Sequence, residues 1–241
     1  MGQAKKLIVK PINHRSASLL VKKVHYSGKV VNNSQLHLGV FWQGRLEGAM
    51  QFGPPMDRRN LIGLVKETKF NDFLELNRMA FTDALPRNSE SRALAIAFRL
   101  IKKKYPQIEW IVSFSDATQS GDGAIYRASG FVLTQINKNK TIKQLLNGEV
   151  AAAHGTSKKD FRGSKVLSGY QLRYIKFMNE AARGRLSVPV LPFSAIDRLG
   201  ARMYRGSKPS VGSVESDTPA IQAGEDGANP ISTLQTKEAD G

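Results

Sequence analysis

The chain has 241 residues, of which 41% are hydrophobic and 23% are charged, so it is long enough to bury a substantial core. It contains no cysteine, which excludes disulfide bonds and thiolate chemistry. No segment reads as a membrane span and the N-terminus lacks the apolar stretch of a signal peptide, so we expect a soluble, intracellular protein.

Positive charge is concentrated in the first four fifths of the chain. There are 36 Lys and Arg against 20 Asp and Glu, a net charge of +16. Only three of the basic and six of the acidic residues lie from Arg205 onward, so residues 1–204 hold 33 basic and 14 acidic groups, a net charge of +19. So basic a region indicates a polyanionic partner, most often nucleic acid. A cationic surface that serves only solubility is the alternative.

The predicted elements begin with a strand over 6–12 and a helix over 16–28, with Ser16 or Ser18 as its N-cap. Alternating apolar residues over 35–53 predict a hairpin that turns at Gln43-Gly44. Another strand follows over 73–81.

The second half begins with a long helix over Ser89–Tyr105, because apolar residues recur there at helical spacing. An almost wholly apolar strand over 108–116 follows, then a short helix over 121–131, capped by Asp122 and ended by Gly130, and closing strands over 131–136 and 169–178. Between those two strands lies a basic insertion, about 137–168, of mixed helical and loop character. Residues 205–241 lack periodicity and predict a disordered acidic tail after one domain, 1–204.

The loop Pro86–Arg92 joins a strand to the long helix and carries two arginines among short polar side chains. The first turn of a helix presents unpaired N–H groups and the positive end of its dipole. The loop therefore predicts an anion site. Its alternative is an ordinary helix start, with Asn88 or Ser89 as cap and two solvated arginines.

Two segments carry a resemblance to the GNAT acyltransferases. ELNRMAFTDALPRNSESRALA (75–95) resembles the strand whose backbone binds the pantetheine arm of acetyl-CoA and the loop that wraps its pyrophosphate. DGAIYRASGF (122–131) is similar to the family's late helix. The resemblance implies an α/β (α+β) fold with a mixed, mostly antiparallel sheet flanked by helices. It also implies acetyl-CoA contacts from these residues: Met79, Phe81, Arg87, Asn88, Ser89, Ser91 and Arg92. The family loop normally has glycines where Glu90, Ser91 and Ala93 stand, so Glu90 has to point away from a phosphate.

A narrower resemblance runs from about Lys5 to Gly206. The strings in 24–54, 74–101 and 111–132 look like those of the Mom DNA-modification family of Mu-like phages. This resemblance implies a transferase that converts adenine in double-stranded DNA to its methylcarbamoyl derivative on the exocyclic amine. The modification shields phage DNA from host restriction, in the host cytoplasm. Acetyl-CoA, and iron in the family, are the implied cofactors.

Two residues are candidates for catalysis. Tyr126 stands where many GNAT enzymes place a tyrosine that protonates the departing thiolate, which a phenol can do because it keeps its proton at neutral pH. A core tyrosine is the alternative. Asp116 follows an apolar strand, at the end where ligands of open sheets gather, and can orient or deprotonate the adenine amine. A turn cap is equally consistent with its position.

Other residues are candidates for the DNA substrate. Asn77 and Arg78 lie on the strand before the loop, where an amide can read the edge of adenine, or can simply pack. Tyr26 can stack on a base flipped out of the duplex, or can cover the core. Lys158, Lys159 and Arg162 form a basic cluster in the insertion that suits the DNA backbone, or a solvated charge run.

Metal ligands are not indicated by the sequence. The four histidines show no paired spacing, so an iron site cannot be placed. Two other functions fit part of the pattern: an ordinary GNAT N-acetyltransferase acting on a small amine or a protein, and a nonenzymatic DNA-binding protein on a GNAT scaffold. The missing loop glycines favour the second.

Overall fold

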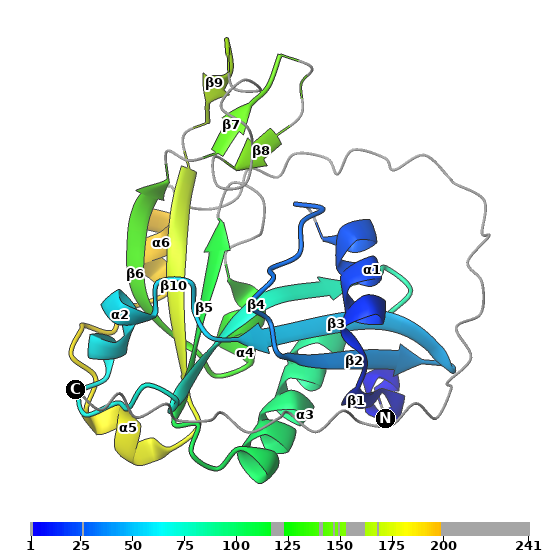
Figure 1. Cartoon of the computed structure of the whole chain (residues 1–241), viewed down its shortest axis with the longest axis horizontal. Helices are drawn as coiled ribbons and strands as arrows, with labels where there is room; N and C mark the ends of the chain where they lie inside the picture. Colours follow the sequence, from blue (N-terminus) through cyan, green and yellow to red (C-terminus); the bar gives the residue numbers. More distant parts are fainter. Residues whose placement is uncertain are drawn as a thin grey trace, which may run out of the picture.

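The computed structural model describes residues 2–25, 27–116, 123–139, 142–146, 148, 150–152, 162–167 and 169–198. Seven strands form one sheet in the order β1-β2-β3-β4-β5-β10-β6 (Figure 1). They are β1 Ile8–Pro11, β2 Leu36–Trp42, β3 Arg45–Gly53, β4 Phe73–Phe81, β5 Trp110–Asp116, β6 Val132–Asn139 and β10 Gly169–Phe177. All neighbours are antiparallel except β4 and β5, which are parallel.

Helices and turns connect these strands. They are η1 Gln3–Lys6, α1 His14–Val24, α2 Arg58–Leu61, η2 Ile62–Leu64, α3 Ser89–Lys104, α4 Ala124–Ala128, α5 Glu180–Gly184 and α6 Ser194–Arg198. The order of the main elements is the one that the GNAT resemblance implies, and the fold prediction is confirmed. The sequence did not indicate the short helices α2, α5 and α6. No helix in the described part of the chain is both long and apolar enough to cross a bilayer.

The sheet buries both of its faces. Buried Leu94, Ala97 and Ile101 of α3 pack with Met50 and Phe52 of β3. Ala17 and Val21 of α1 pack instead with Ala49 of β3 and Ala80 of β4. Because successive residues of a strand point to opposite faces, α1 and α3 cover opposite faces of the sheet.

The first helix begins earlier than predicted. Asn13, not Ser16 or Ser18, is its N-cap, and the Asn13 side chain accepts a hydrogen bond from the backbone N–H of Ser16 at 2.8 Å. Asparagine is as good a cap as serine, so the sequence left the choice open. The helix ends at Val24, with His25 as C-cap.

The described part of the basic insertion is a second sheet and not the mixed helical and loop segment that we expected. Its strands lie in the order β8-β7-β9, with bounds β7 Ile142–Gln144, β8 Val150–Ala152 and β9 Lys165–Val166. It stands beyond one end of the main sheet, above β6, β10 and β5 in Figure 1. The predicted disordered tail, 205–241, lies outside the described residues.

The parallel pairing of β4 and β5 is short. It runs only from Phe73–Trp110 to Glu75–Val112, where the Phe73 and Trp110 rings stack with centroids 4.2 Å apart. On its other side, β4 has one extra residue: Leu76 pairs with Phe52 and Arg78 with Gln51, so Asn77 is bulged. A bulge bends its strand, and here β4 leaves β5 at that point. We call the region where the strands part, Glu75–Asn77 on β4 and Ser113–Ser115 on β5, the β4–β5 fork.

Two histidines at α1 are held in the neutral form. His37 of β2 lies edge-on to His14, with ring centroids 5.2 Å apart, and its Nδ1 is 3.2 Å from Nε2 of Gln51. Burial, and secondarily the charge of His14, lowers the pKa of His37 to about 4. Burial, and secondarily Arg78, lowers the pKa of His25 to about 4 as well.

These pKa values predict a loss of stability in mild acid. The unfolded chain takes up protons near pH 6.5 and the folded chain only near 4, so folding weakens as the pH falls between those values, by roughly 2–3 kcal/mol per histidine. His37→Asn keeps an acceptor for Gln51 but does not titrate. Urea unfolding at pH 7 and at about pH 4.5 should show a smaller difference for this variant than for the wild type. Equal differences would contradict the assignment.

Candidate active site at the β4–β5 fork

Polar groups gather at the fork on the side of α3 and α4. The hydroxyl of Ser113 lies 3.3 Å from the carbonyl oxygen of Leu76 and 3.1 Å from the phenolic oxygen of Tyr126. Ser115, two residues along the same face of β5, has a buried hydroxyl that finds no partner among the described residues. The fork therefore holds a tyrosine and buried hydroxyls where the strands no longer pair.

Tyr126 is held firmly in this place. Its ring stacks on Tyr174 of β10, with centroids 4.4 Å apart and planes 8° apart, and meets Phe131 edge-on at 5.3 Å. Gly123, at φ +73°, is the N-cap of α4, and a side chain there would collide with the Tyr174 hydroxyl. Burial, and secondarily Glu75, raises the pKa of Tyr126, so its hydroxyl keeps its proton at neutral pH.

Glu75 is a functional candidate that the sequence reasoning missed. Burial raises the pKa of its carboxyl, and Asn77, Arg78 and the backbone N–H of Met56 act in the opposite direction. Since the charge of Glu75 also raises the pKa of Tyr126, the two groups interact at the fork. An acidic residue between Leu74 and Leu76 in an otherwise apolar strand was the available signal.

Asn77 and Arg78 are engaged by the chain that follows α1. The hydroxyl of Ser34 donates to Oδ1 of Asn77 at 3.1 Å. Arg78 donates to the carbonyl oxygens of Lys29, at 3.0 Å, and of Asn77, at 2.7 Å. The structure thus places Asn77 in the fork and Arg78 directly after it. Arg78 also lies close enough to His25 for its charge to lower the pKa of that histidine.

The start of α3 presents the features of an anion site. Asn88 is in the left-handed conformation at φ 68° and makes no side-chain cap. Ser89 donates through its backbone N–H to Pro86, and the N–H of Arg92 closes the first helical turn on Asn88. Within the described chain, the N–H groups of Glu90 and Ser91 have no acceptor. Two free N–H groups at the positive end of a long helix suit a phosphate.

A hollow of about 270 Å³ lies at this helix start. Its lining residues are Gly2, Ala4, Lys5, Arg87, Asn88, Ser91, Arg92, Ala95 and Ala128. Nε of Arg92 is buried without a partner among the described residues, so it can hydrogen-bond an anion there. Lys5 was missed, because η1 is remote in sequence and nothing in its pattern signals a ligand. Met79 and Phe81, further along β4, are half-buried against the α3 side of the core.

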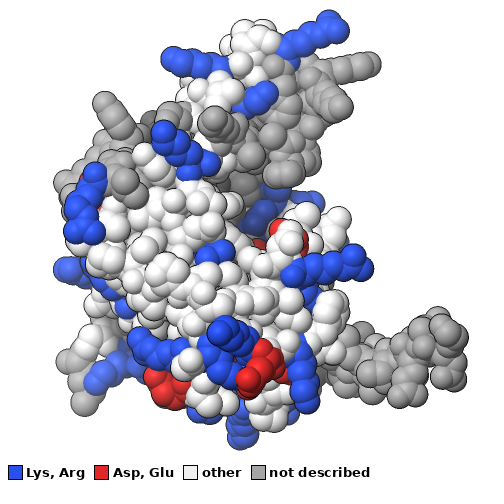
Figure 2. Space-filling view, turned by 90° about the vertical axis from the view of Figure 1, so that its left-hand side faces the viewer, with Lys and Arg blue, Asp and Glu red and all other residues white. Residues whose placement is uncertain are grey.

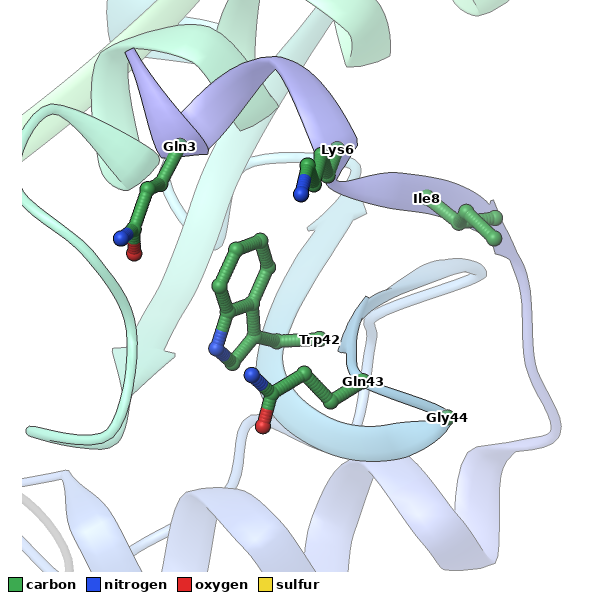
Figure 3. Close-up of a pocket in the computed structure, with 6 residues that line it drawn as sticks. All are labelled: Gln3, Lys6, Ile8, Trp42, Gln43 and Gly44. Carbon is green, nitrogen blue, oxygen red and sulfur yellow. The ribbon is translucent and has the colours of Figure 1, made fainter.

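A larger hollow lies away from the fork. It measures about 330 Å³ and is lined by Gln3, Lys6, Ile8, Trp42, Gln43 and Gly44. Figure 3 shows the side chains of Gln3, Lys6 and Gln43 around the indole of Trp42. No residue of the fork lines this hollow, so we do not take it as the candidate active site although it is larger than the hollow at α3.

Several predicted residues lie outside the described part of the chain: Tyr26, Lys158, Lys159 and Asp122. Asp116 is the last residue of β5, but its side chain is likewise not described. Arg162 is described and exposed. Figure 2 draws the face that lies at the left-hand side of Figure 1. Lys and Arg side chains are spread over this face and the second sheet, and few acidic side chains are visible among them.

A metal centre finds no support among the described residues, where no three His, Asp or Glu side chains come together. His37 faces His14 and Gln51, whereas His25 lies by Arg78. The described residues therefore do not fit the iron that the resemblance implies.

The family model described as the Mom protein family matches residues 6–195. The chain belongs to the Mom protein family. A curated relative, Methylcarbamoylase mom of Escherichia phage Mu, is 37% identical over 196 residues, which cover 76% of this chain and 80% of the relative. The match with the Mom family includes the fork and the start of α3.

Solved acetyltransferase structures show a looser likeness. An N-acetyltransferase from Staphylococcus aureus Mu50 has a TM-score of 0.46 at 12% identity, covering 72% of this chain and 99% of that one. A GNAT family acetyltransferase from Elizabethkingia anophelis with acetyl-CoA bound has a TM-score of 0.44 at 13% identity, covering 71% and 97%. At this level of likeness no residue's role follows from either structure.

The contact between Ser113 and Tyr126 predicts a difference between two serine variants. Ser113→Ala leaves the enclosed Tyr126 hydroxyl without its partner and should lower the free energy of unfolding by about 1–3 kcal/mol. Ser129→Ala is the control, since the Ser129 hydroxyl is buried with no partner among the described residues and its removal should cost little. Urea unfolding of both variants checks this; equal losses would mean that the Ser113 contact contributes nothing.

Proposed function

We propose that the chain is a DNA-modifying methylcarbamoylase that alters the exocyclic amine of adenine, and that it acts in the host cytoplasm to shield phage DNA from restriction. The observation that carries this proposal is the 37% identity to a methylcarbamoylase across most of both chains. The fork supports it, because it combines a carboxylate, a protonated tyrosine and a nearby anion site.

Double-stranded DNA is the proposed substrate. The net charge of +19 on residues 1–204 supports a polyanion, because each phosphate neutralised releases counterions. Arg162 and Lys165 are exposed at the second sheet, and with Lys158 and Lys159 they are proposed to grip the backbone. An enzyme acting on the adenine amine must take the base out of the duplex, and Tyr26 is proposed to stack on it.

An acyl-CoA is the proposed donor. The free N–H groups of Glu90 and Ser91, with Arg87, Arg92 and Lys5, would hold its pyrophosphate, together with the backbone at Asn88 and Ser89. Beyond Glu75 the β5-facing side of β4 pairs with no described strand, so the backbone at Met79 and Phe81 would bind the pantetheine arm. Acetyl-CoA supplies an activated acyl group when bound. An acetyl group contains no nitrogen, so the nitrogen of a methylcarbamoyl group requires a second donor.

Glu75 and Tyr126 have complementary proposed roles. The Glu75 carboxylate can accept a proton from the adenine amine, because its raised pKa makes it a better base than an exposed glutamate. The Tyr126 hydroxyl holds its proton at neutral pH and can give it to a leaving group at the fork. Asp116, Asn77 and Arg78 are proposed to orient the adenine amine.

An ordinary N-acetyltransferase is the second candidate. The anion site at α3 and the fork would serve acyl transfer to a small amine or a protein equally well. This candidate gives no role to the net charge of +19 on residues 1–204.

A nonenzymatic DNA-binding protein is the third candidate, and it gives no role to the polar groups of the fork.

Nucleoside mass spectrometry separates these candidates. DNA from cells that express the chain should contain a heavier deoxyadenosine, which should be absent with the Arg92→Ala/Tyr126→Phe double variant. A methylcarbamoyl product is heavier than an acetyl product by one NH group, so the mass identifies the chemistry. Unmodified DNA from well-expressed wild-type protein would overturn the proposal in favour of the small-amine acetyltransferase or the binding protein.

The role of Glu75 predicts a pH dependence. A base must be ionised, so kcat/KM should fall as the pH drops through the raised pKa of Glu75, at a higher pH than for an ordinary glutamate. Glu75→Gln should lower kcat by about 10²–10⁴ and remove that limb of the profile. Glu180→Gln, at an exposed carboxylate of α5, is the control and should behave as the wild type. A Glu75→Gln profile that keeps the acidic limb would assign the base to another group.

A further inference from the structure

The loop that joins β3 to α2 presents an apolar side chain to solvent. Met56 is 82% exposed, and it follows Pro54 and Pro55. A single exposed apolar residue is ordinary on a protein surface. What sets Met56 apart is how firmly the chain around it is fixed and what lies beneath it.

Both sides of Met56 are anchored. Before it, Asn33 donates through its side-chain amide to the carbonyl oxygen of Pro54, and the two prolines restrict the backbone. After it, the side-chain amide of Asn60 lies 2.8 Å from Oδ1 of Asp57. Arg58 follows, with its guanidinium 4.1 Å from the centroid of Phe70 and 5.4 Å from that of Phe73, where β4 begins. A stiff loop therefore holds one flexible apolar side chain outward.

The backbone of Met56 also lies close to the fork. Gly53, three residues before Met56, pairs with Glu75 of β4, and the backbone of Met56 helps to lower the pKa of Glu75, the residue proposed to accept the proton from adenine. The exposed side chain of Met56 thus stands next to the group that a flipped adenine would have to approach. This arrangement puts an apolar projection beside the fork.

We propose that Met56 is a wedge that enters the base stack of duplex DNA and fills the space left by the extruded adenine. This inference rests on the proposed function. Proteins that open base steps insert apolar side chains such as methionine between them, because such a side chain restores contacts that the displaced base has lost. The thioether side chain is unbranched and adapts to an irregular space.

Charge around the loop suits the same partner. Arg59 is exposed beside this loop, so it is placed to meet a backbone phosphate. Phe70, 59% exposed, lies against Arg58 and extends the apolar surface next to the wedge. A duplex that approached this loop would therefore contact the apolar side chain of Met56 and the cationic side chain of Arg59.

The test compares DNA substrates that do and do not need their adenine extruded. Modification rates are measured for the full chain on one sequence as a duplex, as a duplex with an abasic site opposite the target adenine, and as a single strand. Met56→Ala should lower the rate on the intact duplex at least about tenfold, since unstacking is no longer offset. On the duplex with the abasic site and on the single strand, the modification rate of Met56→Ala should stay within about threefold of the wild-type rate. Met56→Leu should restore most of the duplex rate, and 2-aminopurine at the target should brighten with wild type but not with Met56→Ala.

Controls separate the wedge from its alternatives. Val190→Ala removes another half-exposed apolar side chain and should behave as the wild type on every substrate. Equal losses for Met56→Ala on all three substrates, or none on the duplex, would overturn the wedge while leaving the proposed function intact. A wild type that modifies none of the substrates would overturn the proposed function itself, and the wedge with it.

Discussion

The separation of two parallel strands after three residue pairs is the constraint on which the candidate site depends. Phe73 and Trp110 stack where β4 and β5 still pair, and the bulge at Asn77 turns β4 away immediately afterwards. Without that separation the backbone of β4 would be satisfied by β5, and neither Tyr126 nor Glu75 would have space beside it. The stacked rings close one end of the fork, and the buried hydroxyls of Ser113 and Ser115 line what remains.

The two faces of the sheet differ at the fork. Tyr126 and the start of α3 lie on the face that α3 covers, whereas Arg78 and the chain after α1 lie on the opposite face. In the proposed function, a donor held at α3 and a base that approaches past Met56 would therefore meet through the sheet and would not compete for one surface. Glu75, whose charge raises the pKa of Tyr126, stands with Tyr126 at the point where the two faces meet.

The regular elements could be predicted because their signals are local. The helix Ser89–Lys104, the turn at Gln43-Gly44 and the strand Phe73–Phe81 follow from periodicity and turn chemistry alone. The site could not be predicted to the same degree. Lys5 comes to the start of α3 only through tertiary packing. The pKa of Glu75 is shifted by burial and by the groups packed around its carboxyl. A sequence pattern displays neither the packing nor the burial. The insertion was misread because short strands without alternation resemble loops.

The two tryptophans occupy contrasting surroundings. Trp110 is fully buried beneath Phe73, whereas Trp42 borders an open hollow beside η1, whose other residues line the anion site. Intrinsic emission of the protein is therefore the sum of a shielded fluorophore at the closed end of the fork and an accessible one near the start of α3. A soluble quencher reaches only the second, which gives the molecule two built-in optical reporters, one for the core and one for the surroundings of η1.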